Sequence, residues 1–204
     1  CPEGARAKEE GAFIFASNRN MIERSIDCLP LSGVKQLLEI GFGNGAHLPY
    51  LFAKAPHLHY TGIERSEAMI ADATALNTAL MEQGKAVFLH ALTEELPPLP
   101  YESFEVCFCV NTYYFITNLR AYFAQVYSLL RQGGSFVLSA IGKEFGERMP
   151  FTKEVFTFYT PEQLQELLLS VGFTAFDLQT FTEEIPTKRG TTIERPFEVI
   201  TVRK

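Results

Sequence analysis

The stretch LLEIGFGNGAHLPYL, residues 37–51, places Gly41, Gly43 and Gly45 at every second position, between an apolar run and a helical pattern. Glycine weakens both strands and helices, so glycines at this junction indicate a tight turn or a close backbone approach to another group. Taken alone, they fit a loop that needs positive φ at two positions. A second apolar run, however, ends in Glu64, nineteen residues after Gly45. A glycine turn between strand and helix, with an acid ending the next strand, is typical of sites for a nucleoside-containing cofactor.

Strand-type and helical patterns alternate along the chain from about residue 35. Runs typical of strands cover residues 34–40, 58–64, 86–91, 103–111, 135–141, 173–181 and 195–204, and helical patterns cover residues 46–55, 66–84, 119–134 and 160–173. This alternation predicts an α/β fold, a Rossmann-like three-layer sandwich with a mostly parallel sheet between helices. No helix separates the last two strands, so we expect them to form an antiparallel hairpin.

Polar residues mark where the predicted helices begin. Ser66, Asn118 and Thr160 are the expected N-caps, and Pro161 fits the first helical position after Thr160. Gly84 is expected to end the helix that starts after Ser66. A further helical pattern precedes the first strand. We therefore interpret residues 1–34 as a helical cap on the same domain as residues 35–204.

Composition and charge narrow the classes of function. With 204 residues, 47% of them hydrophobic and 21% charged, the chain fits one globular domain. Its net charge of −6 repels phosphate backbones, which argues against nucleic acid as a partner. No apolar segment reaches the ~18 residues that span a bilayer, and no signal sequence opens the chain, which begins at Cys1 rather than Met. We therefore expect a cytoplasmic protein without a stable membrane anchor.

The four cysteines, Cys1, Cys28, Cys107 and Cys109, form no C-x-x-C pair. Cys107 and Cys109 would share one face of a strand, where they cannot readily bridge each other. We expect buried thiols in a reducing compartment and no metal site, because no Cys or His neighbours stand at ligand spacing.

The glycine turn is compatible with two classes of cofactor. It satisfies G-x-G-x-x-A through Gly41, Gly43 and Ala46, a pattern of dinucleotide-binding folds. However, Glu39 stands two residues before the first glycine, where a carboxylate would repel a pyrophosphate but suits an ammonium or sulfonium group. The Tyr-x-x-x-Lys pair that a short-chain dehydrogenase needs far downstream occurs only within residues 50–54, in the first helix, where it cannot serve.

Four motifs follow one another along the chain: LEIGFGNG (38–45), GIERSEAMI (62–70), LPPLPYESFEVCFCVNTYYF (96–115) and LLRQGGSFVLSA (129–140). Together they resemble the class I S-adenosylmethionine-dependent methyltransferases, and in particular the small single-domain branch related to the ubiquinone and menaquinone biosynthesis methyltransferases. The resemblance covers roughly residues 18–204. It implies a class I methyltransferase domain over residues 35–204, with a seven-stranded sheet in which strand seven runs antiparallel between strands five and six. It also implies S-adenosyl-L-methionine as the cofactor and methyl transfer as the activity.

The resemblance assigns cofactor contacts position by position. Glu39 with Gly41, Gly43 and Gly45 matches the family's acidic glycine motif around the methionine part of the cofactor, and Glu64 matches the ribose-binding acid. The other positions carried over are Arg65 and Ser66, which would flank the adenosine, and Asn111, which follows strand four near the transferred methyl group.

One segment departs from the family pattern. Where the family often has Gly-Asp-Ala, its Asp bonding the adenine amino group, this chain has Ala91, Leu92 and Thr93. We expect the adenine to be held here by backbone contacts and apolar packing around Leu92, or by Thr93 or Glu94.

A sulfonium already makes the methyl group electrophilic, so the protein's main task is to align nucleophile, methyl and sulfur. Such positioning lowers a barrier by roughly 7–11 kcal/mol and needs neither a metal nor a covalent intermediate. A base is needed only if the acceptor must lose a proton. We assign no catalytic base: we interpret His90 as a neutral residue at the sheet edge, and His47, His57 and His59 as surface residues.

Three aromatic segments are expected above the carboxyl edge of the sheet, at residues 13–15, 113–115 and 145–159. The last is a long connection of the kind that often forms a lid. The residues predicted from these segments to bind the acceptor are Phe15, Tyr113, Tyr114 and Phe151. They suggest a small apolar or aromatic acceptor, although core packing explains aromatic side chains equally well.

Two other functions stay open at this point. Leu92 in place of the family's Asp is compatible with a protein that binds S-adenosylmethionine without turnover. The G-x-G-x-x-A pattern is compatible with an NAD(P)-dependent oxidoreductase. The sequence leaves open the identity of the acceptor, the methylated atom and the oligomeric state.

Overall fold

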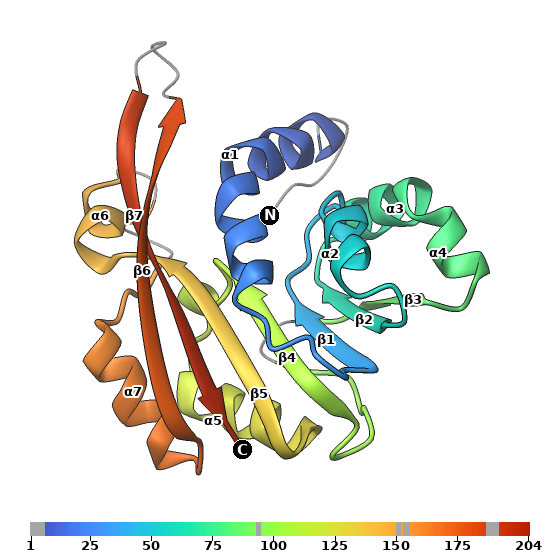
Figure 1. Cartoon of the computed structure of the whole chain (residues 1–204). Helices are drawn as coiled ribbons and strands as arrows, with labels where there is room; N and C mark the ends of the chain where they lie inside the picture. Colours follow the sequence, from blue (N-terminus) through green and yellow to red (C-terminus); the bar gives the residue numbers. More distant parts are fainter. Residues whose placement is uncertain (1–6, 93–94, 150–151, 153–155, 187–191) are drawn as a thin grey trace.

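The computed structural model describes residues 7–92, 95–149, 152, 156–186 and 192–204. Its strands are β1 (Gln36–Ile40), β2 (His59–Glu64), β3 (Ala86–His90), β4 (Phe104–Val110), β5 (Leu130–Ile141), β6 (Thr174–Pro186) and β7 (Thr192–Arg203). They form a seven-stranded sheet in the order β3-β2-β1-β4-β5-β7-β6 (Figure 1). Strands β1 to β5 pair in parallel, whereas β7 runs antiparallel to both β5 and β6. The predicted position of the last strand, between the fifth and the sixth, is confirmed.

The strand order reverses between β1 and β4, and helices pack beside both halves of the sheet. They are α1 (Ala7–Asp27), α2 (Leu48–Lys54), α3 (Glu67–Leu76), α4 (Thr78–Glu82), α5 (Leu119–Leu129), α6 (Lys143–Arg148) and α7 (Pro161–Ser170), with the 3-10 turn η2 at Tyr113–Phe115. Figure 1 shows α2, α3 and α4 beside the β1–β3 half and α5 and α7 beside the other half. Helix α1 stands above the carboxyl ends of the central strands, between α3 and the projecting β6–β7 hairpin.

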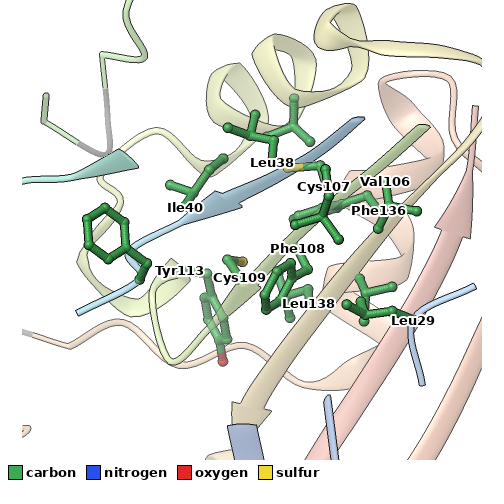
Figure 2. Packing of buried hydrophobic residues seen from close by; sticks show 14 of the residues in the cluster. Leu29, Leu38, Ile40, Val106, Cys107, Phe108, Cys109, Tyr113, Phe136 and Leu138 are labelled. Carbon is green, nitrogen blue, oxygen red and sulfur yellow. The ribbon is translucent and has the colours of Figure 1, made fainter. Parts of the chain in front are cut away.

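The core is built on the central strands, which are buried on both faces. Strand β4 (FEVCFCV) and the second half of β5 (residues 135–141, SFVLSAI) are mostly apolar and buried, as expected for parallel strands covered on both sides. Figure 2 shows this packing; the labelled side chains from the three central strands are Leu38, Ile40, Val106, Cys107, Phe108, Cys109, Phe136 and Leu138. Cys107 and Cys109 are free, buried thiols as predicted, while Cys28 is half-buried.

The predicted helix caps are confirmed. The side chains of Ser66 and Asn118 accept hydrogen bonds from backbone N–H groups of α3 and α5. Thr160 forms a capping box with Gln163 at the start of α7, and Pro161 occupies its first turn. Each cap satisfies amide groups that the helix itself leaves without partners, which fixes where the chain leaves the sheet edge.

Several boundaries differ from the sequence prediction, including the end of α5 at Leu129 and the start of β5 at Leu130, where the helical pattern was expected to continue to residue 134. The single helix expected over residues 66–84 is two helices, because the buried side chain of Asn77 bonds the carbonyl of Gly45 at 3.1 Å and that of Ala73 at 2.9 Å. The helical cap expected within residues 1–34 is the long helix Ala7–Asp27, and the β6–β7 hairpin is longer than expected at both strands. The added hairpin residues pair with each other, from Thr182 with Pro196 to Pro186 with Thr192, whereas α1 packs on residues distant in sequence such as Met69.

Shortening Phe136, which is fully buried, tests this core. We expect Phe136→Ala to lower the free energy of unfolding by about 3–5 kcal/mol, since it removes a large apolar side chain and leaves a cavity. Tyr101→Ala, at an aromatic residue that is 78% exposed, should change it by less than about 0.5 kcal/mol. Urea unfolding followed by circular dichroism measures both. Equal losses in the two variants would contradict the assigned core.

Candidate cofactor site

The glycine turn connects β1 to α2 at the carboxyl edge of the sheet. Gly41, Gly43 and Gly45 have φ angles of 81°, 63° and 65°, so all three occupy the left-handed region that favours glycine. The sequence suggested such a need at only two positions. The amide of Gly41 donates to the carbonyl of Ile63 at 2.7 Å, which continues the β1–β2 pairing into the turn.

The three glycines serve different purposes. A Cβ at Gly41 would lie 2.6 Å from Oγ1 of Thr112, and one at Gly45 would lie 3.0 Å from Ala73 and from Asn77, so both positions are closed by protein. A Cβ at Gly43 would meet nothing within 4 Å among the described residues. Of the three, Gly43 is therefore the one whose bare backbone faces open space, as a ligand-approaching glycine should.

Glu64 ends β2 directly beside this turn. Its Oε2 accepts a hydrogen bond from the amide of Gly43 at 3.0 Å, and its Oε1 accepts from the amides of Arg65 at 2.8 Å and Ser66 at 3.0 Å. The carboxylate is 6% exposed. The acid and the glycine turn, far apart in sequence, thus form one rigid unit. Arg65 is exposed, and its carbonyl oxygen lies 3.0 Å from Nε2 of the exposed His90.

Glu39 lies deeper, at the end of β1 and 2% exposed. Its Oε2 accepts from the hydroxyl of Tyr60 at 2.5 Å and lies 2.8 Å from Nε2 of His47. Burial and the adjacent Glu39 carboxylate raise the pKa of Tyr60 well above its ordinary value, so the phenol stays a donor. The expectation that His47 lies on the surface is wrong: it is 3% exposed, because Glu39 on the neighbouring strand draws its ring inward.

Asn111 follows β4 and completes this edge. It has a φ of 55°, and its amide donates to the carbonyl of Ser139 at 2.9 Å. The hydroxyl of Tyr114 donates to its Oδ1 at 2.9 Å, and its Nδ2 lies 3.3 Å from Oδ1 of Asn18 in α1. A side chain held from both sides in a sparsely populated backbone conformation indicates a functional position.

Helix α1 forms a roof over these residues. At one end Gly11 faces Met69 of α3, where an added Cβ would lie 2.6 Å from the sulfur, and near Asn44 of the glycine turn. Further along, the carbonyl of Ser17 accepts from Arg195 Nη2 at 2.9 Å. The roof thus spans from α3, across the turn, to the β6–β7 hairpin.

The arrangement brings Glu39, Gly43, Glu64 and Asn111 to one edge of the sheet, below one helix. An open, all-parallel dinucleotide fold has the strand order 3-2-1-4-5-6, without an inserted antiparallel strand. Here β7 is inserted antiparallel between β5 and β6. The sheet therefore favours the methyltransferase reading over the oxidoreductase.

A sequence profile described as a methyltransferase domain matches residues 38–138, which include the glycine turn, Glu64 and Asn111. The chain is similar to YdaC, an uncharacterized methyltransferase of Bacillus subtilis (strain 168), with 27% identity over 134 residues, 66% of this chain and 71% of the relative. Residues 38–138 therefore form a methyltransferase domain.

Solved structures show the same fold. A Bacillus halodurans C-125 protein described as a candidate methyltransferase superposes with a TM-score of 0.72 and 14% identity, over 91% of this chain and 99% of its own. Phosphoethanolamine N-methyltransferase 2 of Haemonchus contortus, solved in complex with S-adenosyl-L-methionine, gives 0.68 and 15% identity over 93% of this chain and 52% of its own. The methyltransferase domain and the ligand of this structural neighbour support S-adenosylmethionine as the cofactor. The narrower ubiquinone and menaquinone branch stays a prediction.

The predicted acceptor residues of the methyltransferase are less exposed than expected. Tyr113 and Tyr114 are 1% and 2% exposed, and burial raises the pKa of both phenols. Tyr114 stacks on Phe156 at a centroid distance of 5.4 Å, and its hydroxyl accepts from the amide of Ile141 at 2.6 Å. Both tyrosines thus pack in the core below the roof, whereas Phe15 on α1 is half-buried.

Other predicted positions give less structural information. Leu92 is 54% exposed just after β3. Thr93, the alternative adenine contact Glu94, and Phe151 lie outside the described residues. Within the described part of the chain, no cluster of three metal-ligating side chains occurs and no helix is long and apolar enough to cross a membrane.

Sequence reasoning missed an ion pair on the β6–β7 hairpin of the methyltransferase. Arg195 and Glu183 stand opposite each other in register and are 8% and 7% exposed, with Nε to Oε1 at 2.8 Å. Asn20 of α1 donates to the other oxygen of Glu183 at 2.9 Å. Opposite charges facing each other across a predicted hairpin were the available signal, but the register was not predictable.

The three positive-φ glycines allow a matched test of cofactor approach. We expect Gly43→Ala to weaken binding of S-adenosylhomocysteine at least about tenfold, because the methyl group would enter the open space beside Glu64. Gly133 also has positive φ (77°) and an open Cβ direction, but at the opposite end of the sheet. Gly133→Ala should carry the same backbone strain of about 1–2 kcal/mol with unchanged affinity.

Calorimetric titration and urea unfolding separate the two effects. Gly41→Ala should cost more stability than either variant, since its Cβ would also meet Thr112. Equal affinities in Gly43→Ala and Gly133→Ala would show that Gly43 does not face the cofactor.

Proposed function

We propose that this methyltransferase transfers a methyl group to a small, apolar or aromatic acceptor by in-line displacement. The observation that carries the proposal is the joint placement of Gly43, Glu64 and Asn111 at one sheet edge under α1. When bound, S-adenosylmethionine supplies the electrophilic methyl group. The protein then has to bind the cofactor, orient the acceptor and shield both from water.

Glu64 is suited to hold the ribose. Three backbone amides fix its carboxylate, and charged acceptors form stronger hydrogen bonds to hydroxyl donors than neutral ones do. Gly43 gives the cofactor access to the backbone at the same point. Glu39, at the end of the neighbouring strand, offers a negative charge to the cationic methionine end.

Asn111 and α1 are suited to define the acceptor side. Asn111 is fixed by Tyr114 and paired with Asn18, so α1 must be in place for this edge to be complete. Phe15 on α1 is half-buried, and Phe115 on η2 is 40% exposed beside Phe156. These rings supply apolar surface above the buried tyrosines and support an apolar or aromatic acceptor.

The charge and the cysteines of the chain bear on the class of acceptor and on the cellular location. A net charge of −6 favours a small molecule over nucleic acid as the acceptor. Reduced cysteines support a cytoplasmic location. No general base is assigned, since the exposed His90 bonds a backbone carbonyl and His47 bonds Glu39.

The ribose contact is tested by Glu64→Gln. We expect this variant to bind S-adenosylmethionine and S-adenosylhomocysteine at least about tenfold more weakly by calorimetry, because a neutral amide replaces the charged acceptor. Glu67→Gln, at a neighbouring carboxylate whose side chain is 85% exposed, is the control and should bind as the wild type does. Unchanged binding in Glu64→Gln, or comparable binding of NADH, would contradict the assignment.

The acceptor side is tested by shortening the half-buried ring of Phe15 and the exposed ring of Phe115. We expect Phe15→Ala and Phe115→Ala to raise the acceptor KM several-fold while leaving the affinity for S-adenosylhomocysteine unchanged. The assay is release of S-adenosylhomocysteine with a panel of phenols, quinols, amines and thiols. Leu76→Ala, at a 60% exposed residue of α3, is the control. Unchanged KM for every acceptor in both variants would contradict the proposal that these two rings contact the acceptor.

A further inference from the structure

Glu39 is gripped on one oxygen only. Both the Tyr60 hydroxyl, at 2.5 Å, and His47 Nε2, at 2.8 Å, meet its Oε2. Within the described residues, no hydrogen bond reaches Oε1. The buried side-chain atoms left without a partner in the described residues are Nδ1 of His47 and the hydroxyls of Tyr122 and Ser139, and Oε1 of Glu39 is not among them. Oε1 is therefore not sealed inside the protein, and it can accept a hydrogen bond from a bound ligand.

The absence of a side chain at Gly62 leaves space for the hydrogen bond between Tyr60 and Glu39. Gly62 pairs with Glu39 in the β1–β2 register, two residues after Tyr60. A Cβ at Gly62 would lie 2.8 Å from Cε1 and 2.9 Å from the hydroxyl of Tyr60. The phenol ring thus lies across a position without a side chain, and only in this way does its hydroxyl reach the neighbouring strand.

His47 has no other role that the structure shows. It stands at the N-cap position of α2, yet its side chain makes no cap hydrogen bond. Its Nδ1 is buried and has no partner in the described part of the chain. A Ser or Asp would cap the helix at this position, so the imidazole is explained by its contact with Glu39 rather than by helix formation.

We infer that His47 and Tyr60 are positioning residues that hold Glu39 by Oε2 and leave Oε1 to accept from the ammonium group of the cofactor's methionine end. The inference rests on the proposed placement of the cofactor beside Gly43. A fixed carboxylate forms a charge-assisted hydrogen bond to an ammonium without first losing side-chain freedom. Removing either donor would free the carboxylate to rotate, or leave it charged and unsupported.

The test compares two ligands that differ only at this end. S-adenosylhomocysteine carries the amino-acid group, whereas 5′-methylthioadenosine lacks it and keeps the adenosine. By calorimetry we expect His47→Leu and Tyr60→Phe to weaken S-adenosylhomocysteine about tenfold, with methylthioadenosine unchanged within about twofold. His47→Gln, whose amide can still donate to Glu39, should recover most of the loss. His57→Leu, at an exposed histidine, should bind both ligands normally.

A double-mutant cycle shows whether His47 acts through Glu39. In a Glu39→Gln background, His47→Leu should have no further effect on S-adenosylhomocysteine. A full additional loss there, or equal losses for both ligands, would overturn the inference and make His47 a structural residue. If the wild type binds neither ligand, the proposed cofactor placement itself fails. Should His47→Leu not fold, Tyr60→Phe and His47→Gln carry the comparison.

Discussion

One carboxylate connects the parts of this protein that the fold has to bring together. Glu64 accepts hydrogen bonds from Gly43 across the turn and from the two residues that open α3. It thereby fixes the end of β2, the shape of the glycine turn and the start of a helix at once. Three backbone amides around one buried acid give its carboxylate hydrogen-bond partners and hold it in place.

The turn is held equally firmly from the other side. Thr112 of the β4 end lies against Gly41, and its Oγ1 donates to the carbonyl of Ile40 at 3.2 Å. Asn77 holds the carbonyl of Gly45 from the break between α3 and α4. Between these two closed positions only Gly43 is left open. The ligand side of the turn is thus defined as much by protein contacts at its neighbours as by Gly43 itself.

Local patterns predicted much of the fold. The strand–helix alternation and the caps Ser66, Asn118 and Thr160 depend on residues a few positions apart, and the structure confirms them. The sheet order came from the resemblance rather than from periodicity. What the sequence did not reveal depends on partners distant in the chain. Asn77 interrupts a helical pattern at the point where its side chain bonds the carbonyl of Gly45, far away in sequence.

The candidate site divides in the same way. Glu39, the glycines, Glu64 and Asn111 follow strands, so topology alone places them at one edge. His47 is buried only because a strand carboxylate lies within reach of its ring, which no pattern of polar residues indicates. Tyr114 packs against Phe156 and Phe158, and Tyr113 packs against Tyr159, so the burial of both depends on a connection distant in sequence. The ion pair of Arg195 depends on hairpin register.

The two ends of the α1 roof are held by different forces. Gly11 meets Met69 through apolar contact, whereas Ser17 and Asn20 meet the buried pair of Arg195 and Glu183 through charged hydrogen bonds. Apolar attraction weakens on cooling, while the desolvation cost of an ion pair falls on heating. Temperature therefore acts on the ends in different ways: cold loosens the end over α3, and warmth favours the hairpin end. The contacts at the α3 end of α1 are thus the more sensitive to cold, and those at the hairpin end are the more tolerant of heat.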